Sequence, residues 1–148
     1  MRVPSVLVLF LSATTPALAS GGLSCEGAGR QASIQVEGGV TRGMGGSLFS
    51  FSGSAKIATK AVAADLRKMS FDRENVAQYW LDGKELRLAL YRERSGDRPH
   101  GYVEVTILAK AVGDDGEYKG SYALAAYDTT GDSERRHEAE GRVTCFVE

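Results

Sequence analysis

Histidine is scarce in this sequence, and the motifs of common catalytic sites are missing. The 148 residues include two histidines, His100 and His137, and both lie in or beside charged stretches. There is no GxSxG, HExxH or phosphate-binding motif, and no cysteine–histidine arrangement for nucleophilic catalysis. Asp114, Asp115 and Glu117 do not have the spacing of an EF-hand and instead predict a turn between strands. The sequence therefore predicts no enzyme, no catalytic residues, no metal site and no cofactor.

An excess of one charge and a long apolar run are also lacking. The 18 basic side chains nearly balance the 19 acidic ones. A polyanionic partner would require a basic face, so we do not expect nucleic acid as a partner. The apolar run at residues 6–11 is too short to cross a bilayer, and we expect a protein that does not span a membrane.

The amino terminus has the pattern of a secretory signal peptide. Arg2 precedes the apolar run, and Ala17 and Ala19 form an A-x-A site, which predicts cleavage after Ala19. Residues 1–19 are the predicted signal peptide, and residues 20–148 are predicted to form a single β-barrel-like domain. We therefore expect a periplasmic or secreted protein.

Cysteine and proline are rare beyond the predicted signal. Two cysteines, Cys25 and Cys145, lie near the two ends of the predicted domain, and an even pair in an oxidising compartment indicates a disulfide. Of three prolines only Pro99 follows residue 19, whereas all 18 glycines do. This composition favours many strands joined by turns.

Residues 76–91 give the strongest strand signal. Two alternating runs flank Asp82 and Gly83, and an Asp-Gly pair between such runs predicts a two-residue hairpin turn. We expect Leu81 to lie opposite Lys84. The predicted core face carries Ala77, Tyr79, Leu81, Leu86, Leu88 and Leu90. The other face carries Val76, Gln78, Trp80, Glu85, Arg87, Ala89 and Tyr91.

Alternation predicts further strands at residues 31–37, 48–57, 102–112, 117–127 and 137–147. We expect Val112 to lie opposite Glu117, a register that gives one apolar face on both strands. The glycine-rich residues 38–46 and the charged residues 92–101 are predicted loops. Residues 60–71 have helical composition, but we favour a strand that reaches Val76 through a hairpin loop at residues 72–75.

These elements predict an all-β fold in which about eight antiparallel strands form a meander. The simplest closure is an up-and-down β-barrel, and a two-sheet β-sandwich is the alternative. A disulfide between Cys25 and Cys145 would join the chain ends where the barrel closes.

Three tyrosines on the predicted inner face, Tyr79, Tyr118 and Tyr122, are candidate residues of a ligand cavity. An eight-stranded barrel is just wide enough for one small ligand or for a filled core, and both interpretations remain open. The filled core follows if these large side chains occupy space left by alanine and glycine on the opposite wall.

Candidate partner-binding residues lie on the predicted outer face. Trp80, Arg87 and Tyr91 are residue types typical of binding hot spots, unless residues 60–71 or the glycine-rich loop cover them. The charged loop of residues 92–101, from Arg92 to Gly101, adds Arg98 and His100, although mixed charge is also typical of a solvated loop.

These features favour a non-enzymatic exported β-barrel that binds a protein partner or a small apolar ligand in the periplasm. The alternative is an inhibitor of a secreted hydrolase such as lysozyme, acting through the charged loop. The export signal, size, β content and single disulfide resemble those of bacterial envelope inhibitors of lysozyme. The spacing from Ser95 and Gly96 to Tyr102 departs from that family's motif.

Overall fold

The computed structural model describes residues 20–41 and 48–148, and these form nine β-strands and one short 3-10 helix. The predicted signal peptide lies outside the described residues. Among the residues that are described, no helix is long and apolar enough to cross a membrane. The elements are β1 (Ser20–Ala28), β2 (Ala32–Thr41), β3 (Leu48–Ile57), β4 (Lys68–Asp72), η1 (Arg73–Asn75), β5 (Val76–Leu81), β6 (Glu85–Glu93), β7 (Gly101–Ala111), β8 (Glu117–Asp128) and β9 (Arg135–Val147).

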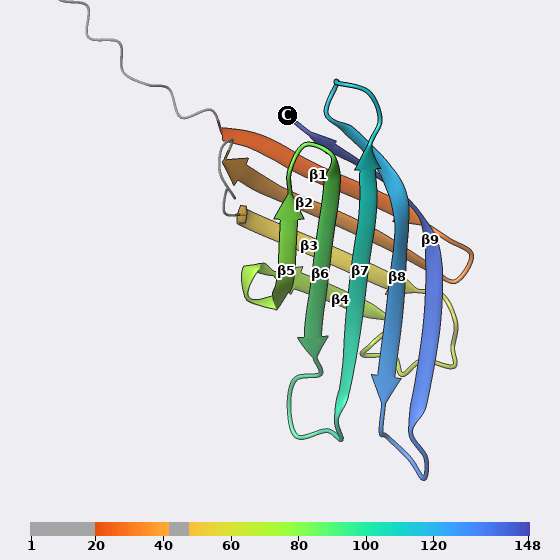
Figure 1. Ribbon diagram of the computed structural model, residues 1–148. Helices are drawn as coiled ribbons and strands as arrows, with labels where there is room; N and C mark the ends of the chain where they lie inside the picture. Colours follow the sequence, from red (N-terminus) through yellow and green to blue (C-terminus); the bar gives the residue numbers. More distant parts are fainter. Residues whose placement is uncertain (1–19, 42–47) are drawn as a thin grey trace, which may run out of the picture.

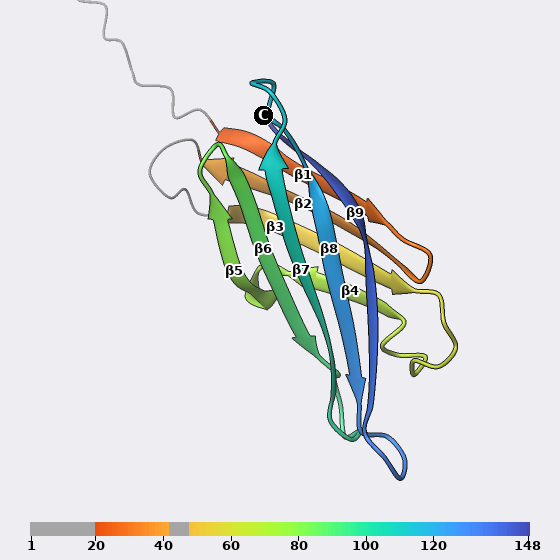
Figure 2. The same ribbon diagram turned by 45° about the vertical axis from the view of Figure 1, so that its right-hand side comes forward.

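All nine strands belong to one antiparallel sheet in the order β4-β3-β2-β1-β9-β8-β7-β6-β5. The sheet folds over so that β5–β9 form one wall and β1–β4 cross behind it as the other (Figure 1). The same two walls are seen after rotation (Figure 2). The first and last strands pair with each other, which nearly closes the barrel. The predicted all-β meander is therefore confirmed.

The strand absent from the prediction is β1. Its inward positions include Leu23, Cys25 and Gly27, and this mixture of sizes gives little apolar alternation. The disulfide prediction is confirmed, since Cys25 on β1 lies directly opposite Cys145 on β9 and the two are bonded. Both cysteines are buried, so the cross-link lies inside the wall formed where the terminal strands meet.

The predicted register of β7 and β8 is confirmed. The Val112 amide donates to the Glu117 carbonyl, and Ala111 pairs with Tyr118. Alternation on both strands therefore predicted which side chains enter the core. Val103, Val105, Ile107, Ala109, Tyr118, Tyr122, Leu124 and Ala126 are all buried.

The predicted register of β5 and β6 is wrong by two residues. Leu81 pairs with Leu86, because the Asp82 carboxylate accepts hydrogen bonds from the amides of Lys84 and Glu85 and the turn closes later. Gly83, at φ +80°, supplies the left-handed residue of this turn. A shift of two preserves the faces of most side chains. Two positions are exceptions. A bulge leaves Ala77 exposed rather than in the core, and it places Val76 opposite Leu90 and against the core rather than on the outer face.

The predicted strand at residues 60–71 is only partly correct, and the predicted hairpin at residues 72–75 is wrong. Only β4 is extended in this stretch, and it does not pair with β5. The Asp72 carboxylate caps the amide of Glu74, while the Asn75 side chain accepts the Asp72 amide, so the chain turns away in η1. β4 and β5 are consequently the two edges of the sheet.

Other contacts complete the barrel around these edges. Arg92 on β6 donates to the carbonyl and hydroxyl of Ser70 on β4, at 2.6 and 3.0 Å. Val62 and Leu66, from the connection at residues 58–67, are buried in the core. The predicted glycine-rich loop is shorter than expected, since residues 38–41 extend β2. Residues 42–47 of that loop lie outside the described residues.

Tyr122 packs at the centre of the barrel. Its ring occupies space left by Gly27 and Gly141, where an added Cβ would approach the ring within 2.7 and 2.6 Å. Its hydroxyl donates a hydrogen bond to the carbonyl of Ala32. The hydroxyl therefore needs no ligand as a partner, and the ring fills space between the walls as in the filled-core interpretation.

Candidate functional site

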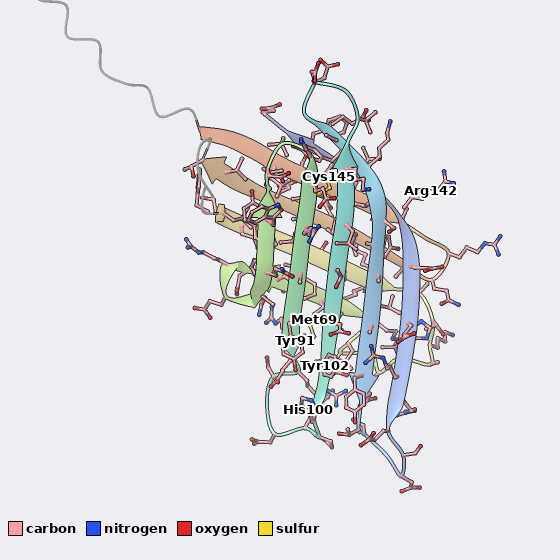
Figure 3. The ribbon with its side chains drawn as sticks, in the orientation of Figure 1. Met69, Tyr91, His100, Tyr102, Arg142 and Cys145 are labelled. Atoms are coloured by element: carbon pink, nitrogen blue, oxygen red, sulfur yellow. A yellow bond between two sulfur atoms is a disulfide. The ribbon has the colours of Figure 1, made fainter. Side chains whose placement is uncertain are left out.

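An aromatic cluster lies on the outer face of the wall formed by β5–β9, at the lower end in Figure 3. We define it as Tyr91, His100, Tyr102 and Tyr127. Ring centroids are 5.1 Å apart for Tyr91 and Tyr102 and 5.2 Å apart for Tyr102 and Tyr127. The His100 ring lies 5.7 Å from Tyr102 and 5.9 Å from Tyr127. The four rings are arranged as one contiguous group.

Strand register assembles this cluster. Tyr102 on β7 lies directly opposite Tyr127 on β8, and Tyr91 on β6 is diagonal to Tyr102 because it pairs with Glu104. Side chains in direct and diagonal cross-strand positions are within reach of one another when they are aromatic. The rings are therefore held by the backbone pairing of three strands and are largely preorganised for binding.

Glutamates lie around the cluster and accept hydrogen bonds from two of its hydroxyls, those of Tyr91 and Tyr127. Tyr91 donates to a Glu93 carboxylate oxygen at 2.8 Å. Burial, followed by this hydrogen bond and the nearby negative charges of Glu93 and Glu104, raises the pKa of Tyr91 to about 12. Burial and then a hydrogen bond to Glu134 raise the pKa of Tyr127. Tyr91 and Tyr127 thus stay neutral in an acidic surrounding.

Arg136 on β9 is the cation beside this cluster. It binds Glu138 at 2.8 Å, Glu104 at 3.2 Å and the Tyr102 hydroxyl at 3.4 Å. The hydrogen bond to Glu138 is the largest contribution to its pKa, which is raised. The side chain therefore spans β7 to β9 across the exposed wall.

A shallow groove of about 620 Å³ adjoins the cluster. Its floor includes the small side chains Thr106, Ala123 and Ala125, and its walls include Glu104 and Arg136. Ala125 is buried although it belongs to an outward position, since larger neighbours stand around it. The groove has the volume of a small-ligand site, but its charged walls and open shape suit a polar surface better than an apolar molecule.

The buried side chain of Arg94 holds the charged loop, residues 92–101, in place. The Arg94 side chain is only 3% exposed and binds Asp65 at 2.6 Å and Asp128 at 3.0 Å. It also donates to the Pro99 carbonyl at 2.7 Å and to the Thr130 hydroxyl at 2.9 Å. One side chain thus joins the connection before β4, the charged loop and the loop between β8 and β9.

Electrostatics in this network favour the ionised forms. Burial alone would raise the pKa of Asp65 and of Asp128, but hydrogen bonds and the charge of Arg94 outweigh it and lower both pKa values. A hydrogen bond from Thr130 also contributes at Asp128. Burial opposes the charge of Arg94 as well, yet the two carboxylates raise its pKa.

The predicted outer patch divides into two parts. Trp80 is 54% exposed and lies opposite Arg87, which is paired with Glu85. Leu108, which sequence reasoning missed, pairs with Arg87 on its other side and is 53% exposed. We call Trp80, Arg87 and Leu108 the upper patch. Tyr91 instead joins the aromatic cluster, four residues further along β6.

The remaining predicted residues occupy several environments. His100 belongs to the aromatic cluster, whereas Arg98 is exposed and lies 3.4 Å from Asp65. Tyr118 and Tyr122 are buried, and Tyr79 is half-buried at the edge of the core. Burial raises the pKa of all three tyrosines, and the Tyr118 hydroxyl adds to this at Tyr79.

Sequence reasoning also missed Tyr102, Tyr127 and the two partners of Arg94. The confirmed register of β7 and β8 contained the signal for the tyrosines, because it places Tyr102 opposite Tyr127 on the outer face. No local pattern identified Asp65 and Asp128, which are 29 and 34 residues from Arg94.

The described residues hold no group of three or more histidine, cysteine, aspartate or glutamate side chains placed to bind a metal. Comparisons with protein-family models, curated proteins and solved structures find no match to this chain.

Proposed function

We propose that this chain is a non-enzymatic exported binding protein, and that a protein partner in the cell envelope docks on the outer face of β6–β9. The aromatic cluster carries this proposal. Tyrosines bury a large area at little entropic cost, and they are enriched among binding hot spots. The neighbouring groove and the upper patch extend the surface available to a partner.

Two features favour a protein partner over a small apolar ligand: the barrel interior is filled, and the exposed rings lie among charged side chains. Tyr122 fills interior space and has its own hydrogen-bond acceptor. The exposed rings lie among charged side chains, as in interfaces with a polar rim. The predicted signal peptide and the disulfide support a location in an oxidising compartment outside the cytoplasm.

The Tyr102→Ser/Tyr127→Ser variant is expected to lose partner binding and keep its fold. Two hot-spot residues together are worth about 4 kcal/mol or more, so affinity should fall by about a thousandfold. Cross-strand pairs contribute only about 0.2–1 kcal/mol to stability, so the melting temperature should change little. The measurement is affinity capture from periplasmic extract, followed by titration of the captured protein.

The matched control is Lys56→Ser on β3, an exposed position on the opposite wall. This variant should capture the same protein as the wild type. Equal capture by the tyrosine variant and the wild type would show that the partner does not use the aromatic cluster.

Inhibition of a secreted hydrolase such as lysozyme is the second candidate function. It is favoured by the Arg94 contacts, which hold the charged loop at the Pro99 carbonyl and leave Arg98 and His100 exposed. A loop fixed in one conformation binds with a smaller loss of entropy, which suits an inhibitor.

In this case the wild-type protein slows lysozyme, and Arg98→Ala/His100→Ala abolishes the inhibition without changing thermal stability. The assay is hydrolysis of cell-wall substrate by lysozyme with increasing amounts of each protein. A hydrolysis rate that the wild type leaves unchanged eliminates this function for lysozyme.

A further inference from the structure

A pocket of about 390 Å³ lies where the charged loop and the end of β6 meet the connection at residues 58–67 and the edge strand β4. Its lining includes three arginines, Arg92, Arg94 and Arg98, and two carboxylate residues, Asp65 and Glu93. The lining therefore carries one net positive charge. The pocket is of interest because the partners of the three arginines differ.

Two of these arginines already have carboxylate partners. Arg94 binds Asp65 at 2.6 Å and Asp128 at 3.0 Å, and Arg98 lies 3.4 Å from the second oxygen of Asp65. Asp128 also binds Arg135, at 3.4 Å. Three guanidinium groups thus share two carboxylates, and this network leaves no negative charge for the third arginine of the pocket.

That third arginine, Arg92, is held by neutral groups. Its Nη1 atom donates to the carbonyl of Ser70 at 2.6 Å and to the Ser70 hydroxyl at 3.0 Å. It forms no ion pair within residues 20–41 and 48–148. The neighbouring Glu93 instead accepts the hydroxyl of Tyr91. Arg92 is therefore a half-buried cation whose counter-ion is not supplied by the described part of the chain.

The Nε and Nη2 atoms of Arg92 have no hydrogen-bond acceptor among the described residues. Neither belongs to the buried unpartnered nitrogens of that part of the chain, so both are accessible to solvent. The Nε–H and Nη2–H bonds are parallel and form a fork that fits two oxygen atoms of one carboxylate or phosphate group. The bonds from Nη1 to Ser70 fix this fork in advance, which lowers the entropic cost of binding.

The same fork is used by a carboxylate elsewhere on β6. In Arg87, Nε and Nη2 both donate to Glu85, with Nε at 3.1 Å. Arg136 on β9 also donates through Nε to a carboxylate, that of Glu138. Carboxylates of this chain thus bind arginines through the donors that have no acceptor in Arg92.

We propose that this pocket binds a small anion through the Nε–Nη2 fork of Arg92, and that the ligand carries a carboxylate or phosphate group. Ser95 and Arg98 supply further donors in the lining, and Met69 supplies an apolar contact for the rest of the ligand. The volume suits a small organic acid or phosphate ester. This site is independent of the proposed docking surface, since none of the four residues of the aromatic cluster lines it.

The test is an NMR titration of the ¹⁵N-labelled, disulfide-bonded protein at pH 7, observed at the arginine Nε–H signals. Sodium phosphate or sodium acetate replaces sodium chloride at constant ionic strength, so that screening stays the same. We expect the Arg92 signal, identified by its loss in Arg92→Lys, to shift with a Kd of about 1 mM for at least one of the two oxyanions. The lower Kd shows whether the pocket prefers phosphate or carboxylate.

Arg92→Lys should raise the Kd for the preferred anion by about tenfold, because the charge remains but the parallel pair of donors is lost. Arg87→Lys is the matched control on the same strand. Its fork is already occupied by Glu85, so this variant should leave the Kd unchanged. Binding to both variants is followed at the backbone amide of Ser95, which they retain.

Two results would overturn this anion site. One is an Arg92 signal that does not move when phosphate or acetate replaces up to about 50 mM chloride. The other is a Kd that Arg92→Lys and Arg87→Lys change equally, which would indicate general attraction to positive charge rather than binding by the fork of Arg92.

Discussion

Replacing Arg94 with methionine is expected to lower the free energy of unfolding by about 3–5 kcal/mol, because it leaves two carboxylates without their buried cation. Asp128 is the more affected partner, since its side chain is only 6% exposed, whereas that of Asp65 is 28% exposed. Methionine retains the apolar packing of the arginine stem, so the loss reports the charge and hydrogen bonds. The measurement is equilibrium unfolding in guanidinium chloride at neutral pH.

Arg98→Ala is the matched control. Arg98 also pairs with Asp65, at 3.4 Å, but its side chain is 64% exposed. Exposed ion pairs contribute about 0–1 kcal/mol, so this variant should unfold almost as the wild type does. Equal losses in the free energy of unfolding for the two substitutions would show that burial does not increase the contribution of Arg94 to stability.

The effect of Arg94→Met should also depend on pH. Asp65 and Asp128 have lowered pKa values in the folded protein, so their stabilising contribution is complete above the unfolded pKa of about 4 and is lost as pH falls through the folded pKa. In the Arg94→Met variant, burial still raises the pKa of the two carboxyl groups, and the charge of Arg94 no longer opposes this effect. The difference in stability between wild type and variant should therefore shrink from neutral toward acid pH.

Removing the disulfide is the second large expected effect. The Cys25→Ala/Cys145→Ala variant should lose about 2–5 kcal/mol, because the cross-link constrains a long loop in the unfolded chain. The cysteines are separated by 120 residues, which places the chain-entropy estimate at the upper end of that range. The fold should persist, since β1 and β9 remain hydrogen-bonded. Guanidinium chloride unfolding of variant and oxidised wild type gives the difference.

The reduced wild type is the control for packing. It retains both sulfur atoms but lacks the covalent bond, so it should unfold at nearly the same denaturant concentration as the double alanine variant. A variant within about 1 kcal/mol of the oxidised protein would show that the cross-link constrains the unfolded chain little.

Sequence alternation predicted the β7 and β8 register because every second residue is apolar on both strands. The register predicted for β5 and β6 was wrong by two residues. The Asp82 carboxylate binds the amides of Lys84 and Glu85, and this contact determines which residues of the two strands pair. Sequence alternation also failed after Asp72, because a capping box turned the chain out of the sheet. Short polar contacts of this kind leave no trace in apolar periodicity.

The candidate site was predictable to a different extent. Trp80 and Arg87 were placed on the outer face, as found, because a two-residue shift of register does not change the face. Arg94 could not be distinguished from the other arginines of the charged loop. Its burial depends on Asp65 and Asp128, which only the three-dimensional fold brings near it.

The open seam between β4 and β5 divides the chain into two consecutive folding units. Within β1–β4 and within β5–β9, every strand pairs with its neighbour in sequence, so each unit forms through local contacts. The pairing of β1 with β9 is the non-local step among the described strands, and the disulfide fixes that pair. The barrel therefore has the strand order of a circularly permuted meander. Its two unpaired edges, β4 and β5, lie on either side of η1, and the strands at the chain ends are paired and joined by the Cys25–Cys145 disulfide. Pairing of β1 with β9 would then be the slow step of folding when the cysteines are reduced. In the oxidised chain the disulfide already holds these two strands together, so their pairing becomes a local step.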